Sequence, residues 1–213
     1  MSASDFTNTI ISFSKLKKSN GDGMPDVILE RLAEKLILNE DFHKSSWTET
    51  LLTLLLKGLS NNQFENREKL IQKIIMKLNT KDFSSWKPHN LSMIVSSLEI
   101  IIHSPPLDDS NLTFSGSGCS GRGHTRMEES KLICSKIITY IAGRDDLHLW
   151  NENDIIKLIT SLSKFESSNT INININNYLV IIITKASKNN ELAHAIRNQK
   201  EKIKSKVRAM KIF

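Results

Sequence analysis

The glycine pattern that could bind a nucleotide phosphate lies in the middle of the chain. Gly116, Gly118 and Gly121 reproduce the G-x-G-x-x-G spacing, in which glycines let backbone N–H groups approach a pyrophosphate at the start of a helix. That fingerprint requires a buried strand before it, whereas the preceding segment contains Pro105, Pro106 and several polar residues. We therefore interpret these glycines as part of a flexible linker.

The cysteine, histidine and serine residues give no pattern typical of metal binding or catalysis. Cys119 and Cys134 form no C-x-x-C pair, and such sparse cysteine is typical of reduced thiols in an intracellular protein. His124 follows Cys119 by five residues, and two ligands on one loop do not make a zinc site. Serine, histidine and aspartate occur without a nucleophile elbow or another ordered arrangement. The sequence predicts no cofactor, no small-molecule substrate and no enzyme activity.

The positive charge of the chain is concentrated near its C-terminus. The 213 residues include 29 basic and 23 acidic ones, which gives a net charge of +6. Residues 197–211 contain seven basic residues against Glu201 alone, which leaves 22 basic and 22 acidic residues elsewhere. A short basic tail on a neutral body is a common way to bind a polyanion, either nucleic acid or an anionic membrane surface.

The tail also carries an apolar seam. Ile196, Ile203, Val207 and Met210 stay on one edge of a helix, while basic residues occupy most other positions. We expect a helix at residues 197–213 that docks by this edge; a disordered tail and a helix on anionic lipid are the alternatives. The RNA-phosphate contacts predicted here, which would make binding salt-dependent, are Arg197, Lys200, Lys204, Lys206 and Arg208.

A second basic feature is a row of lysines four residues apart, namely Lys69, Lys73, Lys77 and Lys81. Like charges at this spacing destabilise a helix by a few tenths of a kcal/mol per pair, roughly. The row is therefore a candidate for phosphate contacts. A solvated helix face in a lysine-rich sequence is the other interpretation.

Three tryptophans indicate the elements that must position these residues. Each is followed by apolar residues five, eight, nine and twelve positions later, which is the period of one helix face. We predict that each Trp begins an amphipathic helix and packs against the preceding repeat rather than on bases. The sets are Trp47 with Leu52, Leu55, Leu56 and Leu59; Trp86 with Leu91, Ile94, Val95 and Leu98; and Trp150 with Ile155, Leu158, Ile159 and Leu162.

Further apolar stripes predict a second helix in each repeat. In the last repeat, the alternating residues 171–176 are interpreted as a loop or helix start before an apolar run from Tyr178 to Ala186. The other stripes are Val27, Ile28, Leu32, Leu36 and Ile37; Leu70, Ile71, Ile74, Ile75 and Leu78; and Leu132, Ile133, Ile137, Ile138 and Ile141. The first helix of the first repeat is expected at Phe6, Thr9, Ile10 and Phe13.

The spacing of the tryptophans sets the domain organisation. They are 39 and then 64 positions apart, and removing a Gly/Ser/Pro-rich segment at 104–128 restores a period of 39. Helix pairs at a fixed period stack into an all-α solenoid. We predict a solenoid at 1–196 with a flexible insertion at 104–128 and a basic tail at 197–213. Its four repeats fall at about 1–41, 42–82, 83–146 and 147–190.

A helix that opens on Trp and continues from Ile155 to Phe165 as IIKLITSLSKF, repeated near every 39 residues, resembles the octotricopeptide and heptatricopeptide repeats. Phe6 to Leu16 closes in a similar way on Ser-Phe-Ser-Lys-Leu. These organellar RNA-binding proteins often carry a C-terminal RAP domain, which is not evident in this sequence. If helices lining the inner surface read RNA as in other helical-repeat binders, the outward candidates are Lys57, Lys157, Thr160, Ser161 and Lys164.

The resemblance implies non-catalytic RNA binding in an organelle, in particular the mitochondrion. The expected partners are ribosomal RNA or organellar transcripts and ribosomal or other repeat proteins, so the chain would be ribosome-associated or RNA-stabilising. The chain has no apolar run of about twenty residues and no secretory signal pattern, which predicts a soluble intracellular protein without membrane insertion. The rival hypothesis is a protein-binding scaffold of the HEAT or armadillo kind.

Overall fold

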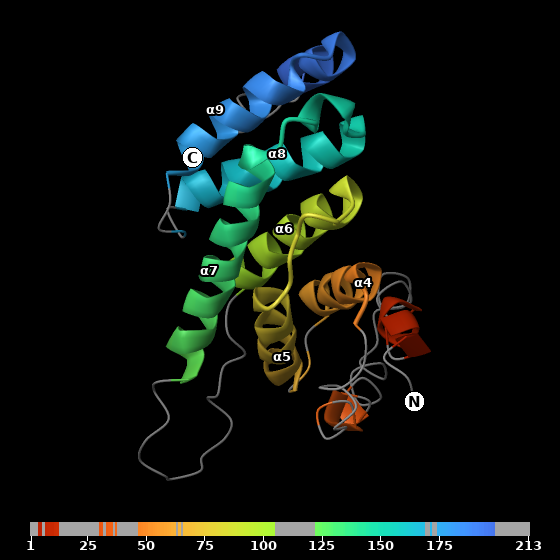
Figure 1. The fold of residues 1–213 in the computed structure, drawn as a ribbon. Helices are drawn as coiled ribbons and strands as arrows, with labels where there is room; N and C mark the ends of the chain where they lie inside the picture. Colours follow the sequence, from red (N-terminus) through yellow and green to blue (C-terminus); the bar gives the residue numbers. More distant parts are fainter. Residues whose placement is uncertain are drawn as a thin grey trace. The chain divides into compact units, whose positions relative to one another are not determined.

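The computed structural model shows only helices as regular elements among the residues that it describes, which confirms the predicted all-α class (Figure 1). The chain divides into two compact units. The first unit is Met1–Trp86 with Ser97–Cys134, and the second is Lys87–Ser96 with Ser135–Phe213. The described residues are 4–5, 7–12, 30–31, 33–35, 37, 47–62, 64, 66–104, 122–168, 171 and 174–198.

The labelled helices of the described residues are distributed over the two units. The first unit contains α4 (Glu49–Ser60) and α5 (Arg67–Asn79). It also contains α6, which as a whole spans Pro88–His103, from Ser97 onward, and α7, which as a whole spans Arg122–Gly143, as far as Cys134. The remainder of α6 and α7 belongs to the second unit, with η2 (Leu147–Leu149), α8 (Glu152–Ser168) and α9 (Ile175–Ala186). A further helix occupies residues 190–198.

Each tryptophan lies two residues before a helix, as the repeat pattern predicts. Trp47 precedes α4, Trp86 precedes α6 and Trp150 precedes α8. The three indoles are only 3 %, 5 % and 4 % exposed, and all twelve apolar residues of the predicted rows are buried. Thr48 caps the N-terminus of α4, because its hydroxyl accepts a 3.3 Å hydrogen bond from the Leu51 N–H.

The second helices confirm most of the predicted apolar stripes. All five stripe residues of α5 are buried, and so are Ile133, Ile137, Ile138 and Ile141 on α7. The prediction is wrong for Leu132, which is 65 % exposed. Cys134 lies on the buried face of α7 instead. It precedes Ile137 by three residues, and a helix face repeats every three to four residues.

The predicted C-terminal boundary of the insertion at 104–128 is too late in the sequence. Helix α7 begins at Arg122, so residues 122–128 are helical. Of these seven residues only Gly123 disfavours a helix strongly, and a helix nucleated further along extends readily through the rest. Ser104 closes α6, because its N–H and its hydroxyl both donate to the Ile100 carbonyl, at 2.9 and 2.7 Å. Residues 105–121 lie outside the described part of the chain.

The predicted first repeat is described only in part. Residues 4–5 and 7–12 are helical, and Ile10 is fully buried as expected, whereas Phe6 and Phe13 lie outside the described residues. Of the second stripe only Ile37 is described, and it is half-buried. Ile10 packs against α4 at Gly58, where an added Cβ would lie 2.7 Å from Ile10 Cγ2.

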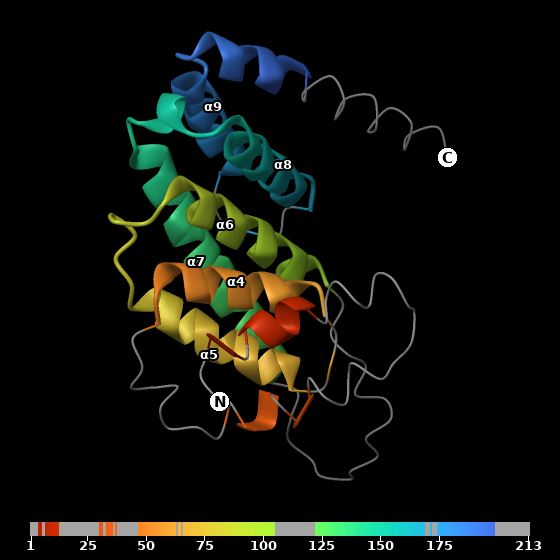
Figure 2. The same cartoon turned by 90° about the vertical axis from the view of Figure 1, so that its right-hand side faces the viewer.

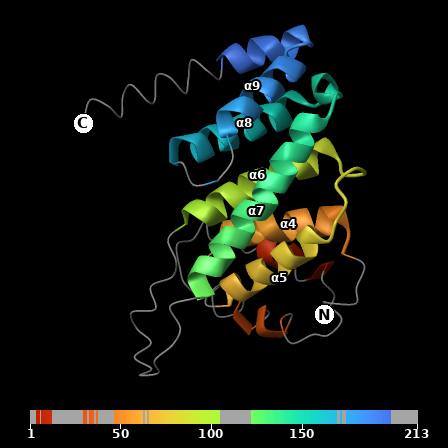
Figure 3. The same ribbon diagram turned by 60° about the vertical axis from the view of Figure 1, so that its left-hand side comes forward.

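In the second compact unit, α8 and α9 lie side by side (Figures 1 and 3). Ile171 forms a buried bend between them, and α9 begins at Ile175, which confirms that this stretch leads into a helix. The side chain of Asn174 caps α9 by accepting a 3.2 Å hydrogen bond from the Asn177 N–H. Asn189 caps the helix at 190–198 in the same way, with a 2.9 Å bond from the Glu191 N–H.

The contact at Gly58 gives a test of this packing. We expect Gly58→Ala to destabilise the protein by about 1–3 kcal/mol, because a β-branched isoleucine in a full core cannot move away from the new methyl group without strain. Gly143→Ala is the matched control, since an added Cβ there meets no atom within 4 Å. Urea unfolding monitored by circular dichroism measures both free energies of unfolding, and equal stability of the two variants would contradict the packing described here.

Candidate functional site

The lysines at positions 69, 73 and 81 make contacts within the fold, and because α5 ends at Asn79, Lys81 lies just beyond that helix. Lys69 Nζ donates to Asn66 Oδ1 at 2.9 Å, and Lys73 Nζ donates to the Ile37 carbonyl at 2.6 Å. Lys81 Nζ lies 3.2 Å from the Trp47 carbonyl, just ahead of α4. Ammonium groups that bind carbonyl oxygens satisfy acceptors that helix ends and loops leave open. These contacts give three lysines of the row a structural role, whether or not the row also contacts phosphate.

The candidate residues on α4 and α8 have different environments. Lys57 near the end of α4 and Lys164 on α8 are exposed, and Lys157 is half-buried. Ser161 was expected to point outward, but it is 3 % exposed and its hydroxyl donates to the Lys157 carbonyl at 3.1 Å. It follows Leu158 by three residues on the buried face of α8, so this prediction is wrong. Thr160 is half-buried and bonds the Ile156 carbonyl at 2.8 Å.

The structure describes one of the five predicted contacts of the basic tail. Arg197 is exposed near the end of the helix at 190–198. Lys77, the remaining member of the α5 row, is half-buried. Lys200, Lys204, Lys206 and Arg208 lie outside the described residues, as does the predicted helix beyond position 198.

An aspartate on α8 contacts two polar side chains of α6, a contact that the sequence analysis did not predict. Asp154 Oδ1 lies 2.9 Å from His89 Nδ1 and 3.3 Å from Ser92 Oγ. The single hydroxyl proton of Ser92 can instead go to the His89 carbonyl, 3.0 Å away. In a catalytic triad the histidine stands between the serine and the aspartate. Here the carboxylate contacts both other side chains, so the arrangement differs from that of a triad, and it links α6 to α8.

A second polar cluster forms where α7 ends. The Arg144 guanidinium binds both carboxylate oxygens of Asp146, at 2.8 and 2.6 Å, and donates to the Tyr140 hydroxyl at 3.1 Å. It also lies 5.6 Å from the centre of the Trp150 ring, within range of a cation–π interaction. The hydrogen bond from Arg144 lowers the pKa of Asp146, and the bond to Asp146 raises the pKa of Arg144. The cluster fixes the chain between α7 and the Trp150 helix.

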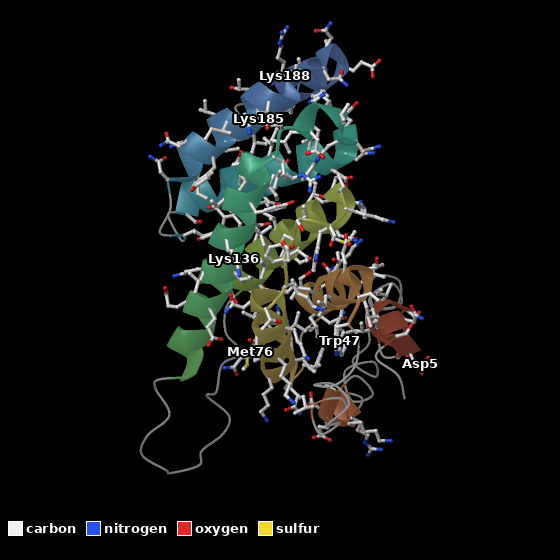
Figure 4. All side chains as sticks on the ribbon, in the orientation of Figure 1. Asp5, Trp47, Met76, Lys136, Lys185 and Lys188 are labelled. Carbon is white, nitrogen blue, oxygen red and sulfur yellow. The ribbon has the colours of Figure 1, made fainter. Side chains whose placement is uncertain are left out.

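Lys185 closes the same corner from the last turn of α9 (Figure 4). Its ammonium group donates to the carbonyls of Ala142 and Arg144, both at 2.9 Å, and lies 3.1 Å from Asp145 Oδ1. Carbonyls at a helix C-terminus carry partial negative charge and lack partners within the helix. Lys185 therefore connects α9 to the end of α7, much as Lys81 connects the end of α5 to the segment before α4.

A buried arginine connects α4 to α5. Arg67 is 1 % exposed, its Nε donates to the Leu59 carbonyl at 2.7 Å, and its Nη1 pairs with Glu68 Oε1 at 2.7 Å. Burial lowers the pKa of Arg67 to about 10. Sequence reasoning missed this residue and Lys185, because an arginine or lysine next to a helix terminus looks the same whether it faces solvent or a neighbouring helix.

The described residues give no positive sign of a metal centre or a membrane span. Across the described ranges, no three His, Cys, Asp or Glu side chains gather in a way that could hold a metal ion. Within the same ranges, every helix is too short or too polar to cross a membrane. Comparison of the chain with protein-family models, curated proteins and solved structures finds no match.

The lowered pKa of Asp146 predicts a pH dependence. A carboxylate whose pKa is depressed in the folded state contributes stability above its unfolded pKa of about 3.9, and loses it as the pH falls through the folded pKa. We expect wild-type protein to exceed Asp146→Asn in free energy of unfolding above about pH 5, with the gap closing as the pH falls through the folded pKa of Asp146. Denaturant unfolding across this pH range measures the gap; a constant difference would show that the ion pair contributes nothing.

Cys134 is expected to be an inert thiol in the native protein. It is fully buried, and burial, together with the charge of Glu99, raises its pKa well above the usual range. In a Cys119→Ser variant, which leaves Cys134 as the one remaining cysteine, a thiol reagent at about pH 8 should react slowly until denaturant is added, because the thiolate is the reactive form. Rapid labelling of the folded variant would rule out this burial.

Proposed function

We propose that this chain is a non-catalytic RNA-binding protein whose helix pairs stack as an α-solenoid of about four repeats. The observation that carries the proposal is the placement of charge. All of the net charge of +6 falls in residues 197–211, which continue directly from the described helix at 190–198 with its exposed Arg197. A cluster of this density attracts phosphate and releases counterions when it binds.

The solenoid part of the proposal is supported by the shared design of the Trp-headed helices. Trp47, Trp86 and Trp150 each precede a helix with the same buried row, and a second helix follows each time. Within the two compact units, α4 packs on α5 and α8 packs on α9. Repeats of this kind present extended surfaces suited to long ligands.

Several lysines of the described residues have a structural role within the fold. Lys73, Lys81 and Lys185 bind backbone carbonyls of their own compact unit. The proposed phosphate contacts are the tail residues together with Lys57 and Lys164, which are exposed on α4 and α8. The finer parts of the proposal are a mitochondrial location, a ribosomal or transcript RNA partner and association with ribosomal or other repeat proteins. They rest on the resemblance to octotricopeptide-type repeats.

The test compares two variants that remove equal charge. Lys200, Lys204 and Lys206 are replaced by Gln in one, and the exposed Lys87, Lys136 and Lys188 are replaced by Gln in the other. RNA affinity of the whole protein is measured by fluorescence anisotropy between about 50 and 200 mM salt. The tail variant should weaken binding and reduce the slope of log affinity against log salt by about two to three, whereas the body variant should change both far less.

Two outcomes would contradict the proposal. Equal weakening by both variants would indicate diffuse attraction of RNA to a basic protein. Absence of RNA binding, together with salt-insensitive capture of a protein partner, would favour the HEAT- or armadillo-like scaffold. Crosslinking of the native protein followed by sequencing of bound RNA identifies the RNA class.

A further inference from the structure

The second compact unit contains an apolar groove that its own described helices leave open. The groove has a volume of about 570 Å³, and its lining residues belong to α8, α9 and the segment that follows α9 up to Arg197. Figure 2 shows the ribbons of α8 and α9 in this unit. Ile159, Leu179, Val180, Ile183 and Ile196 make its lining mainly apolar, with polar side chains such as Ser163 and Asn176 among them. Val180 is 63 % exposed.

The shape of the groove fits a helix. Beside Leu179, the lining residues of α9 and its C-cap are Asn176, Val180, Ile183 and Ser187, which follow one another at four, three and four positions and form a stripe along the helix. At about 1.5 Å per residue this stripe is roughly 16 Å long, or about three helical turns. Exposed apolar stripes of this kind bind the apolar face of an amphipathic helix.

The segment that follows the groove in the sequence has a matching apolar seam. Arg197 lines the groove, and residues 199–213 continue from it. Ile203, Val207 and Met210 stand at four and three positions from one another, the spacing that an anchoring helix face requires. Residues 199–202 provide four positions for a turn, which is within the usual length of a connection between helices.

We propose that the groove is the docking site of this chain's own C-terminal segment, residues 199–213, which seats Ile203, Val207 and Met210 between α8 and α9. Lys202, Lys204 and Arg208 are about a quarter turn or more from this seam, so docking leaves their charges at the surface. Glu166, an exposed acid among the lining residues, offers a partner to a tail lysine. Docking does not depend on RNA, and it is tested in RNA-free protein.

Two neighbouring residues on α9 provide the decisive variants. Val180 lines the groove, whereas Ile181, which is 39 % exposed, is not among the lining residues. Val180→Glu places a charge in the groove without removing a buried side chain, and Ile181→Glu places the same charge beside it. Circular dichroism and thermal unfolding first establish that both variants keep the fold.

The readout is cleavage of the full chain by trypsin at the basic residues between positions 200 and 211, followed by mass spectrometry. In the wild type this cleavage should be at least about tenfold slower than in a free peptide of residues 199–213, because a docked helix must open before a protease can cut it. Val180→Glu should remove the protection and Ile181→Glu should not. Val207→Glu should match Val180→Glu, and the double variant should add nothing further, because both break one contact.

Other results would overturn the proposal. Cleavage of the wild-type tail at the rate of the free peptide would show that the groove does not hold it. Equal effects of Val180→Glu and Ile181→Glu would show that protection does not come from the groove. Protection that rises with protein concentration would assign the groove to the tail of a second copy instead.

Discussion

Burial of the tryptophan that precedes each of the helices α4, α6 and α8 is the constraint on which the other features depend. An indole removes on the order of 150–250 Å² from water, worth roughly 4–6 kcal/mol before conformational entropy is counted. Trp86 packs edge-on against Phe83, with ring centres 5.1 Å apart, and Trp150 lies beneath the guanidinium of Arg144. Once each ring is buried, the apolar row behind it must face the same interior, and this sets the rotation of α4, α6 and α8.

Charged and polar side chains then complete the corners that this packing creates. Arg67 joins α4 to α5, Lys185 joins α9 to the end of α7, and Asp154 joins α8 to α6. All three bring a charge to a place where neighbouring backbone or side-chain groups need a hydrogen-bonding partner. These three charged side chains act within the fold, and because the rest of the chain has equal numbers of basic and acidic residues, residues 197–211 carry the net charge.

The second compact unit combines a well-satisfied polar corner with an open apolar groove. The Arg144 guanidinium makes short hydrogen bonds to its neighbours. Val180, by contrast, is exposed on the apolar stripe of α9 that lines the groove. A soluble protein rarely leaves a long apolar stripe uncovered, because such a surface binds a partner or another part of the chain. The apolar stripe on α9 is the reason to expect an occupant, and the seam in residues 199–213 supplies one of the right spacing.

The sequence by itself determined the helical class, the position of each Trp-headed helix and nearly all of their buried residues. These follow from a local period of three to four residues, which a chain expresses wherever it folds. Only the tertiary structure decided that Leu132 faces outward, that Ser161 is buried, that α7 begins at Arg122 and that His89 meets Asp154. The last pair is 65 positions apart, and a cation has the same appearance in a sequence whether it will bind a phosphate or a carbonyl. The difference depends on which acceptors folding brings within about 3 Å.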